Sequence, residues 1–479
     1  MTSDYDVVIV GAGPVGLLLS CELRLAGLIV LLLERRTDSE GLAETRAFVM
    51  HARSLEIFAA GGILEHVFGP ETDANYVLLV PQYRTEEIFR HCAEELGAVI
   101  VEGVKVQSIN PTDHNITVTG VYNTTKKNGQ TFTVTGRYLV GADSVRSTVR
   151  ELAQIDFVGN PPINTVMSGE AMLGVPMPNP YIVRNKNGLV IAADMKVPSG
   201  RTRLNVFVSS QATIPEPVPV TLEELNEGLR MITGVDYKLS NPCMLKRFSN
   251  EQRLASRYQS GRVFIVGDAC HNLPAGGQGL NMGFQEALNL GWKLGAVIRD
   301  SAPSSLLHTY EDERLPAARA VVQNTTSQSL LFFASTSPEW AVRNSMEGLL
   351  RVPEASRDLA LEISGFAVSY PKPLDMLRPD GWQTLPKNMQ GVRALDVKIR
   401  TPDGVVTKLS EHMRDGRWIQ LMLPGTSRCS QSIPAFGDWT VVVEVSDMPD
   451  REERAGLYTG DFSEIPVRPD GYLAFERMV

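Results

Sequence analysis

The residues with the clearest chemical potential in this chain are three glycines near its beginning. Gly11, Gly13 and Gly16 have the spacing GxGxxG and follow an apolar, β-branched run at residues 5–10. At this spacing the first glycine permits a tight turn, the second lets the backbone approach a pyrophosphate, and the third lets a helix pack closely. The pattern predicts a phosphate-binding turn for a dinucleotide, against the alternative of an ordinary glycine turn.

The elements that must position these glycines are also visible. Residues 5–10 predict a buried parallel strand, residues 14–26 a helix, and residues 28–33 a second strand. Glu34 ends the second strand, about 20 residues beyond the glycines, where an acidic side chain can hydrogen-bond a ribose hydroxyl. An acid at this place favours NAD or FAD over a dinucleotide with a 2′-phosphate.

A second glycine-rich region follows far along the chain. An apolar strand predicted at 263–266 runs into Gly267 and Asp268, and the stretch PAGGQGLNMG at 274–283 precedes a helix predicted over 284–299. Glycines before a helix N-terminus expose backbone N–H groups at the positive end of the helix dipole, which can stabilise negative charge. Taken alone, this stretch is equally compatible with a flexible loop, and Asp268 with a helix cap.

The chain thus contains three motifs in a fixed order: the GxGxxG turn, the pair Gly267 and Asp268, and the glycine-rich stretch at 274–283. Together they resemble the motifs of the class A flavoprotein monooxygenases. This is the para-hydroxybenzoate hydroxylase family, which includes the aromatic polyketide hydroxylases and rifampicin monooxygenase, and the resemblance covers nearly the whole chain. It implies an FAD cofactor with Glu34 on the adenosine ribose and Asp268 on the ribityl chain. Residues 274–281 would then line the isoalloxazine ring.

The resemblance also implies roles for residues whose ordinary interpretation would be a surface ion pair or a turn. Arg46 is the residue expected nearest the reacting ring and is the catalytic candidate, whereas His271 is expected to be structural. Asp143 lies in a segment similar to the family's DG motif, which serves both FAD and the passing NAD(P)H. The expected FAD contacts are Gly11, Gly13, Pro14, Val15, Gly16, Glu34, Arg35, Arg46, Gln82, Val106, Asp143, Gly267, Asp268, Pro274, Gly276, Gly277, Gly279, Leu280 and Asn281.

The chain departs from the family pattern at three places. Ser144 replaces the glycine of the DG motif. If that position needs a positive φ, the serine lowers the free energy of unfolding by about 1 kcal/mol. The segments between Gly62 and Pro81 and between His271 and Pro274 are shorter than in the family. Two explanations remain open for these gaps: loop residues are missing from this sequence, or the substrate pocket is trimmed and open.

A length of 479 residues predicts two or three domains. The expected fold class is α/β, with a Rossmann-like FAD-binding domain, an inserted antiparallel sheet for the substrate and a thioredoxin-like C-terminal domain. The expected boundaries are 1–160 with 250–345 for the FAD-binding domain, 161–249 for the substrate-binding sheet, 346–385 for a connecting helix and 386–479 for the thioredoxin-like domain.

The inserted sheet and the C-terminal domain offer fewer chemical signals. Arg203, Met172 and Phe207 are the substrate-contact candidates, with core packing as the alternative for the two apolar ones. The C-terminal domain has no CxxC motif and Cys429 stands alone, so a redox role is not expected there. Its expected role is scaffolding or the formation of a homodimer.

Composition excludes several other classes of function. The apolar fraction of 43% and the charged fraction of 21% are those of a globular protein, and the net charge of −9 argues against nucleic acid as a partner. Five single cysteines indicate a reducing compartment without a metal site. Glu22 and Arg24 interrupt the apolar N-terminal run, so we expect a cytoplasmic protein without stable membrane insertion.

The resemblance implies a complete reaction. NADPH or NADH would reduce FAD, and O₂ would form a C4a-hydroperoxyflavin that hydroxylates an aromatic or polycyclic secondary metabolite. One alternative is a flavoenzyme without hydroxylation, such as an oxidase, a Baeyer–Villiger enzyme or a cyclising enzyme. Another is a flavin-binding module that has lost catalysis.

Overall fold

The computed structural model describes most of the chain. Arg46, Pro274 and Gly276, three of the expected FAD contacts, lie outside the described residues, as does Cys429. The described residues are 4–37, 49–60, 77–124, 127–194, 200–273, 277–299, 302–370, 374–378, 383–384, 391–394, 396, 398–413, 416–422, 440–445 and 462–478.

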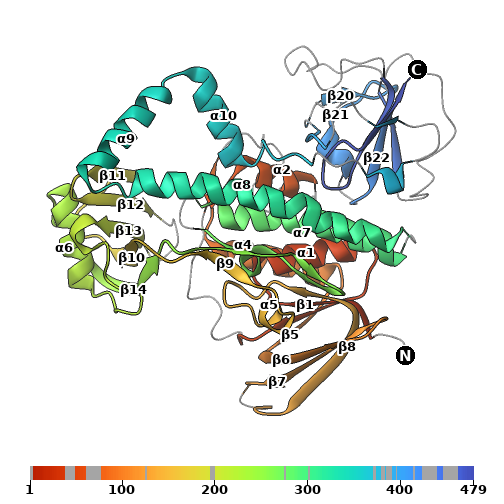
Figure 1. Ribbon diagram of the computed structural model, residues 1–479, viewed down its shortest axis with the longest axis horizontal. Helices are drawn as coiled ribbons and strands as arrows, with labels where there is room; N and C mark the ends of the chain where they lie inside the picture. The colour runs from red at the N-terminus through yellow and green to blue at the C-terminus, as the bar shows by residue number, and fades with distance from the viewer. Residues whose placement is uncertain are drawn as a thin grey trace.

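An eight-stranded sheet organises the first part of the protein (Figure 1). β1 (Tyr5–Val10) lies between β2 (Val30–Glu34) and β8 (Thr131–Gly141) and runs parallel to both. β1 and β2 are nearly continuous runs of buried apolar residues, as parallel strands covered on both faces must be. The central order is β16-β17-β8-β1-β2-β5, with β5 (Val99–Glu102), β16 (Gln259–Ser260) and β17 (Val263–Ile265).

The two faces of this sheet pack against different layers. Val7 and Ile9 point to helices α1 (Pro14–Leu25) and α7 (Gln278–Arg299), and they share one apolar core with them. Val8 and Val10 point to the opposite face, which is covered by an antiparallel layer continuous with β8. The other elements of this region are β6 (Val104–Pro111), β7 (Ile116–Tyr122), α4 (Gln82–Glu95) and α5 (Thr148–Leu152).

Helix α7 begins earlier than the sequence predicts. The prediction placed its start at residue 284, whereas the helix begins at Gln278 and includes the glycines at 279 and 283. A side chain at Gly283 would place its Cβ 2.6 Å from Val15 Cγ2 of α1. This glycine therefore belongs to a close helix contact, and interpreting it as part of a loop was wrong.

A second, antiparallel sheet of five strands follows, covered on one face by α6 (Leu222–Thr233). The Thr221 side chain accepts a hydrogen bond from Glu224 N at 3.0 Å and caps the helix start, and Gly234 ends the helix with φ 77°. The strand order is β11 (Tyr181–Asn185), β12 (Gly188–Asp194), β13 (Thr202–Val208), β10 (Thr165–Met172) and β14 (Ser240–Ser249).

Three short sheets and one helix complete these parts of the chain. The strands β9 and β15 carry the chain from the first sheet to the second and back, and β20 and β21 form a hairpin in the C-terminal part. These elements are β9 (Phe157–Asn160) with β15 (Gln252–Ala255) and β18 (His271–Asn272), β3 (Val49–Met50) with β4 (Leu78–Leu79), β20 (Lys398–Arg400) with β21 (Val406–Lys408), and α2 (Ala52–Ala60).

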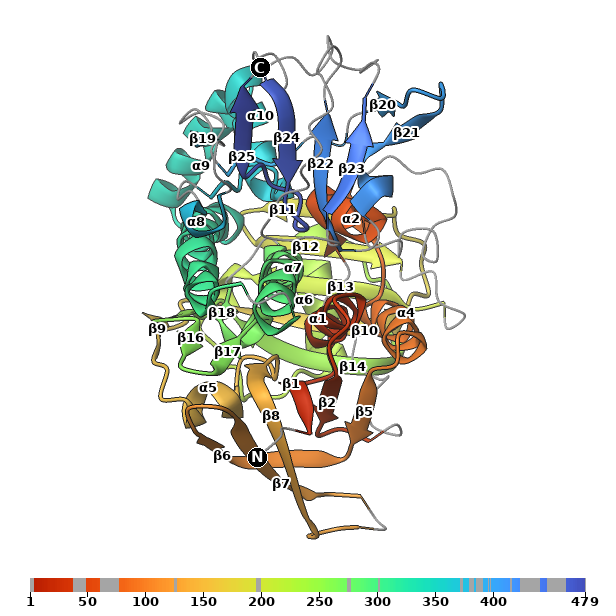
Figure 2. The same ribbon diagram turned by 90° about the vertical axis from the view of Figure 1, so that its right-hand side faces the viewer.

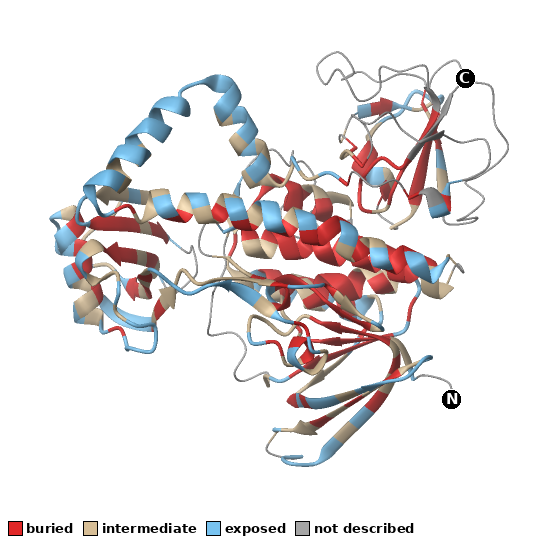
Figure 3. Ribbon diagram, viewed as in Figure 1, coloured by how far each residue is buried: buried red, intermediate tan, exposed pale blue. Residues whose placement is uncertain are grey.

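Three helices follow the second glycine-rich region. α8 (His308–Phe332) packs on α7, whereas α9 (Ser337–Leu349) and α10 (Pro353–Ser364) form an arch that stands away from the body (Figures 1 and 3). Neither α9 nor α10 has a buried residue. The single connecting helix expected at 346–385 was wrong, because Pro353 starts a new helix and Gly365 ends it with φ 82°.

The C-terminal part contains a five-stranded mixed sheet, which lies above α2 in Figure 2. β22 pairs with β23 in parallel and with β24 in antiparallel, and β24 pairs with β25 in antiparallel. The strands are β19 (Gln383–Thr384), β22 (Trp418–Met422), β23 (Thr440–Glu444), β24 (Phe462–Val467) and β25 (Phe475–Met478).

Two cations and two anions, buried together, join α7, α8 and the turn after β24. Glu313 of α8 accepts hydrogen bonds from Lys293 Nζ of α7 at 2.7 Å and from both Nη atoms of Arg468 at 2.9 Å. Arg468 Nη2 also lies 2.6 Å from Asp470 Oδ2, and Asn289 Nδ2 donates to the carboxylates of Glu313 and Asp470. We call these five residues the buried charge network. All four charged side chains are at most 2% exposed.

The network sets the ionisation of its central carboxylate. Burial by itself raises the pKa of Glu313, but the charges of Arg468 and Lys293 outweigh burial and lower that pKa from 4.5 to about 2. Glu313 therefore stays ionised inside the protein, and the network carries no net charge.

Among the described residues, no helix is long and apolar enough to cross a membrane. Within the same ranges, no three His, Cys, Asp or Glu side chains lie together where they could hold a metal ion.

We expect Glu313→Gln to lower the free energy of unfolding of the holoenzyme by about 3–5 kcal/mol, because it leaves two buried cations short of a partner. Because folding depresses the pKa of Glu313, its contribution is complete above pH 4.5 and is lost as the pH falls toward 2. Urea titrations from about pH 7 down to about pH 2 measure both effects, and the variant should lack the loss of stability that the wild type shows below pH 4.5.

Glu347→Gln is the matched control, because Glu347 lies 3.4 Å from Arg351 on the exposed arch. This change should lower the free energy of unfolding by no more than about 0.5 kcal/mol. Equal losses in the two variants would show that the buried charge network does not stabilise the fold.

Candidate functional site

The phosphate-binding turn has the geometry that its three glycines predict. Gly11 has φ 106°, and a Cβ there would lie 2.3 Å from Ala142 O on the neighbouring strand. A Cβ on Gly16 would lie 2.1 Å from Gly11 O, so only glycine lets α1 pack on the turn. A Cβ on Gly13 would meet nothing within 4 Å. This open side of Gly13 is where the pattern expects a pyrophosphate.

The N-terminus of α1 points at the same open side. Gly13 is its N-cap and supplies no side-chain cap, and Pro14 occupies the first helical position. The first N–H groups of the helix therefore keep their capacity to bind an anion, and the helix dipole favours negative charge there. Both features fit the diphosphate of FAD.

Glu34 lies at the end of β2 and is held beside this turn. Its Oε2 accepts a hydrogen bond from Ala12 N at 2.8 Å, and its Oε1 accepts from Arg36 N at 2.9 Å and Nε at 3.1 Å. Burial raises the pKa of Glu34, but the charge and hydrogen bonds of Arg36 outweigh it, so the net shift is downward. The ionised carboxylate has lone pairs left for a ribose hydroxyl.

The residue that orients Glu34 was not among the expected site residues. It is Arg36, which reaches back to the carboxylate, whereas Arg35, an expected FAD contact, is exposed. Two adjacent arginines after a strand point to opposite faces, which sequence alone does not resolve. Only the three-dimensional position of Glu34 identifies Arg36.

The turn at Gly267 and Asp268 is held in place by a buried glutamate of α7. Gly267 has φ 63° and donates its N–H to Glu286 Oε2 of α7 at 2.7 Å, and His271 Nε2 lies 3.3 Å from the same oxygen. Both His271 and Glu286 are buried, whereas Asp268, directly after Gly267, is exposed. His271 therefore lies inside the fold, as expected. The sequence analysis did not identify Glu286.

The side chain of Asn281 is fully used in hydrogen bonds within the protein. Its Oδ1 accepts from His51 N and Ser54 Oγ, both at 2.7 Å, and its Nδ2 donates to Val49 O and Gly277 O. These four hydrogen bonds use the full capacity of the amide. The side chain thus joins α7 to the start of α2, and only its backbone remains available to a flavin.

The segment like the DG motif forms a helix cap. Asp143 accepts from Ser147 Oγ at 2.5 Å and from Val149 N at 3.1 Å at the start of α5. Burial raises the pKa of Asp143, and these hydrogen bonds partly offset that effect. Ser144 has φ 73°, so this serine does occupy a position that favours glycine.

The remaining expected FAD contacts have mixed positions. Val15 packs against Gly267 and Gly283, where it keeps the two glycine-rich motifs together. Val106 is 4% exposed, and its side chain packs in the apolar core beneath β8. Gln82 starts α4 and donates to Glu86 at 2.7 Å. Gly277 is exposed with φ 65°, and Gly279 and Leu280 are half-buried in the first turn of α7.

The three substrate candidates do not form one contact set. Arg203 is 2% exposed and pairs with Glu170 at 2.7 Å, and Phe207 packs on Phe333 with ring centres 4.8 Å apart. Met172 is 38% exposed at the far end of its strand, beyond a register shift. Phe207 therefore takes the packing role that was its alternative.

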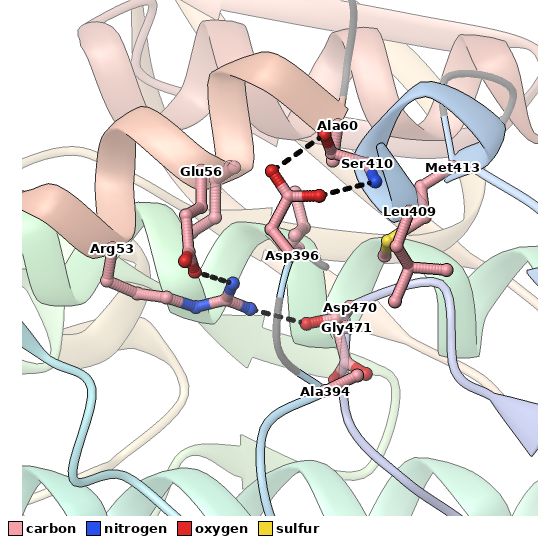
Figure 4. Close-up of a pocket in the computed structure, with 12 residues that line it drawn as sticks. Arg53, Glu56, Ala60, Ala394, Asp396, Leu409, Ser410, Met413, Asp470 and Gly471 are labelled. Carbon is pink, nitrogen blue, oxygen red and sulfur yellow. Dashed lines mark hydrogen bonds and ion pairs between the residues drawn. The ribbon is translucent and has the colours of Figure 1, made fainter. Parts of the chain in front are cut away.

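A cavity lies between α2 and the C-terminal part, away from the glycine motifs (Figure 4). Its volume of about 20 Å³ suits roughly one water molecule. Arg53 crosses it, with its guanidinium 2.9 Å from Glu56 and 2.6 Å from Asp470 O. The cavity is too small for an organic substrate and belongs to the contact between the two units.

We expect Gly13→Ala to fold normally but to bind FAD at least tenfold more weakly, because its methyl group would occupy the space of the pyrophosphate. Gly16→Ala should instead lower the free energy of unfolding, because its methyl group collides with Gly11 O. Flavin fluorescence titration and urea unfolding of both apoproteins separate the two effects. Unchanged FAD affinity in Gly13→Ala would place the pyrophosphate elsewhere.

We expect Ser144→Gly to raise the free energy of unfolding by about 1 kcal/mol, because glycine adopts φ 73° without strain. Gln154→Gly, at φ 54°, should act in the same direction. Ser337→Gly is the control, since it lies in the first turn of α9 and should bring no gain. A loss of stability in Ser144→Gly would mean that the serine side chain itself stabilises the turn.

Comparison with known proteins agrees with this geometry. Residues 4–71 and 66–325 match the model of a family described as FAD binding domain. The chain is 34% identical over 99% of its length to an uncharacterized aromatic compound monooxygenase of Bacillus subtilis, covering 95% of that protein. It is 35% identical over 98% of its length to the 12-dehydrotetracycline 5-monooxygenase/anhydrotetracycline 6-monooxygenase of Streptomyces rimosus, covering 95% of that protein.

The fold agrees as well. The solved structure of anhydrotetracycline hydroxylase from Streptomyces rimosus superposes with a TM-score of 0.84 at 34% identity, covering 99% of this chain and 96% of that one. The family match spans more than half of the chain, and the similarity to the relatives extends from end to end. The chain thus belongs to the FAD-binding family of class A flavoprotein monooxygenases, and it is an FAD-dependent monooxygenase.

Proposed function

We propose that this enzyme hydroxylates a polycyclic aromatic secondary metabolite, using NADPH or NADH and O₂. The observation that carries the proposal is the pairing of the phosphate-binding turn and Glu34 with a second sheet whose face opposite α6 is turned toward the FAD-binding part (Figures 1 and 2). The names of the relatives, which include tetracycline-type monooxygenases, support the same substrate class.

The residues of this chain bind and orient the cofactor. The backbone around Gly13 and the N-terminus of α1 would hold the diphosphate, Glu34 the ribose, and Asp268 the ribityl chain. The N-terminus of α7 would stabilise negative charge on the ring. FAD, when bound, supplies the hydride-accepting and oxygen-transferring chemistry. The protein contributes orientation and the exclusion of water from the space between ring and sheet.

Several finer assignments belong to the same proposal. Arg46 is proposed as the side chain nearest the reacting ring. The FAD-binding domain is proposed to comprise 1–160 and 250–345, with the substrate sheet at 161–249. The strand order β23-β22-β24-β25 supports a thioredoxin-like domain at 386–479. A cytoplasmic location and a homodimer are further proposals; fractionation and sedimentation measurements test them.

We expect the holoenzyme to lose its oxidised flavin absorbance under NADPH without O₂, and to lose it faster with anhydrotetracycline present as a probe. In air containing ¹⁸O₂, the product should gain one ¹⁸O atom by mass spectrometry. A modified product without ¹⁸O would contradict hydroxylation and favour an oxidase or cyclising reaction. A flavin that NADPH never reduces would favour a module that has lost catalysis.

A further inference from the structure

Residues 49–56 contact two parts of the protein that are far apart in the sequence. They comprise the strand β3 and the beginning of α2, and we call them the bridge segment. On one side the bridge segment is hydrogen-bonded to the start of α7, residues 277–281, which the proposed function places beside the flavin. On the other side it is hydrogen-bonded and ion-paired to the C-terminal part of the chain.

The contacts on the α7 side all involve the amide of Asn281. Its Oδ1 accepts hydrogen bonds from His51 N and Ser54 Oγ, both at 2.7 Å. Its Nδ2 donates to Val49 O at 3.0 Å and to Gly277 O at 2.9 Å. A Cβ on Gly277 would also lie 3.4 Å from Val49 Cβ. The backbone at the start of α7 is therefore held by the bridge segment.

The contacts on the other side depend on Arg53, which is 6% exposed. Its Nη1 lies 2.9 Å from Glu56 Oε2, and its Nη2 donates to Asp470 O at 2.6 Å (Figure 4). The second oxygen of Glu56 accepts a hydrogen bond from Arg393 Nη1 at 2.7 Å. One carboxylate of α2 is thus shared by two arginines, and Arg53 also binds the backbone of the turn after β24.

Close packing fixes the orientation of this guanidinium. The Cζ atom of Arg53 lies 5.4 Å from the centre of the Tyr472 ring. Gly471 has φ 79°, and a Cβ there would lie 3.2 Å from Arg53 Nη2. A Cβ on Gly365, at the end of α10, would lie 3.2 Å from Arg53 Cβ. The cavity beside Arg53, with its volume of about 20 Å³, is too small for the side chain to turn into.

The two sides of the bridge segment meet within one turn of α2. Ser54 N donates to His51 O at 2.9 Å, which closes this turn around Arg53. Because Arg53 and Ser54 are consecutive, a displacement of the arginine also moves the donors on the α7 side. Every link from Asp470 O to Gly277 O is a covalent bond or a hydrogen bond no longer than 2.9 Å. Such a contiguous set of contacts can couple two sites, and a measured coupling energy establishes that it does.

We propose that the C-terminal part positions the start of α7 against the flavin, and that Arg53 is the positioning residue through which it acts. The inference rests on the proposed function, which places the N-terminus of α7 at the flavin ring. There the helix N-terminus favours negative charge on the ring, and a displaced N-terminus favours it less. Arg53 takes no part in the chemical step.

The test is the two-electron midpoint potential of the flavin in the FAD-loaded enzyme, measured by anaerobic titration against a redox dye. Arg53→Met removes the hydrogen-bond donors but keeps an unbranched side chain. We expect it to lower the affinity for reduced relative to oxidised flavin about threefold. This is a fall of about 15 mV in the potential, since a tenfold change in a two-electron equilibrium is about 30 mV. An unchanged or raised potential would overturn the inference.

Arg247→Met is the matched control. Arg247 is 5% exposed and pairs with Glu224 at 2.6 Å on the α6 side of the second sheet. The control should lower the free energy of unfolding, as Arg53→Met does, but it should leave the midpoint potential unchanged. An equal fall in potential in both variants would mean that the effect comes from a general loss of stability, and the positioning role would be refuted.

A conservative variant decides the question if Arg53→Met does not fold. Arg53→Lys keeps the charge but lacks the planar fork that reaches Glu56 and Asp470 O together. We expect the midpoint potential of this variant to fall in the same direction by a smaller amount. If only Arg53→Lys folds and its potential equals that of the wild type, the inference fails.

A double-mutant cycle locates the route. Asn281→Ala removes the hydrogen bonds between the bridge segment and α7. In this background, Arg53→Met should change the midpoint potential by less than half of its effect in the wild type. Fully additive changes would show that the two residues act independently, which would refute the route through Asn281.

The outcome is independent of the proposed reaction. NADPH reduction of the flavin and ¹⁸O incorporation with anhydrotetracycline are measured on the wild type. If those succeed while Arg53→Met leaves the potential unchanged, the proposed function stands and the positioning role fails. If no ¹⁸O is incorporated while the potential falls in Arg53→Met alone, the positioning role stands and the proposed reaction is wrong.

Discussion

Glu313 lies between two buried cations, and the relative positions of the helices depend on it. Lys293 and Arg468 are buried, so α7, α8 and the turn after β24 must meet in the one geometry that pairs these charges. Helix α7 transmits that geometry to the cofactor side. Asn281 lies about 18 Å along the helix from Lys293. The position of the flavin-facing segments is thus tied to a charge network far from the cofactor.

Close backbone packing is the second constraint, and it explains why glycine occurs at both motifs. At Gly11 and Gly16 a methyl group would collide with a carbonyl oxygen, whereas at Gly13 the space is open. Val15 fills the gap between Gly267 and Gly283 and so joins motifs that are some 250 positions apart in the chain. Gly11 and Gly16 thus allow close packing of the backbone, whereas Gly13 leaves space for a ligand.

The two faces of the second sheet differ in chemistry. Its α6 face is almost wholly apolar, with Arg247 and Glu224 at the margin. Its opposite face contains an ion pair and an amide–hydroxyl pair, which stabilise a fold little compared with apolar side chains of the same size.

The sequence by itself determined the turn at Gly11 to Gly16, the flanking strands and Glu34, because local periodicity and glycine spacing encode them. It could not decide where α7 begins, because a glycine such as Gly283 is typical of a loop. Only the contact of Gly283 with Val15 shows that this glycine belongs to the helix. Nor could the sequence identify Glu286, Arg36 or the hydrogen bonds of Asn281. The partners of Glu313 and Asn281 lie 155 and 230 positions away, and only tertiary packing brings such groups together.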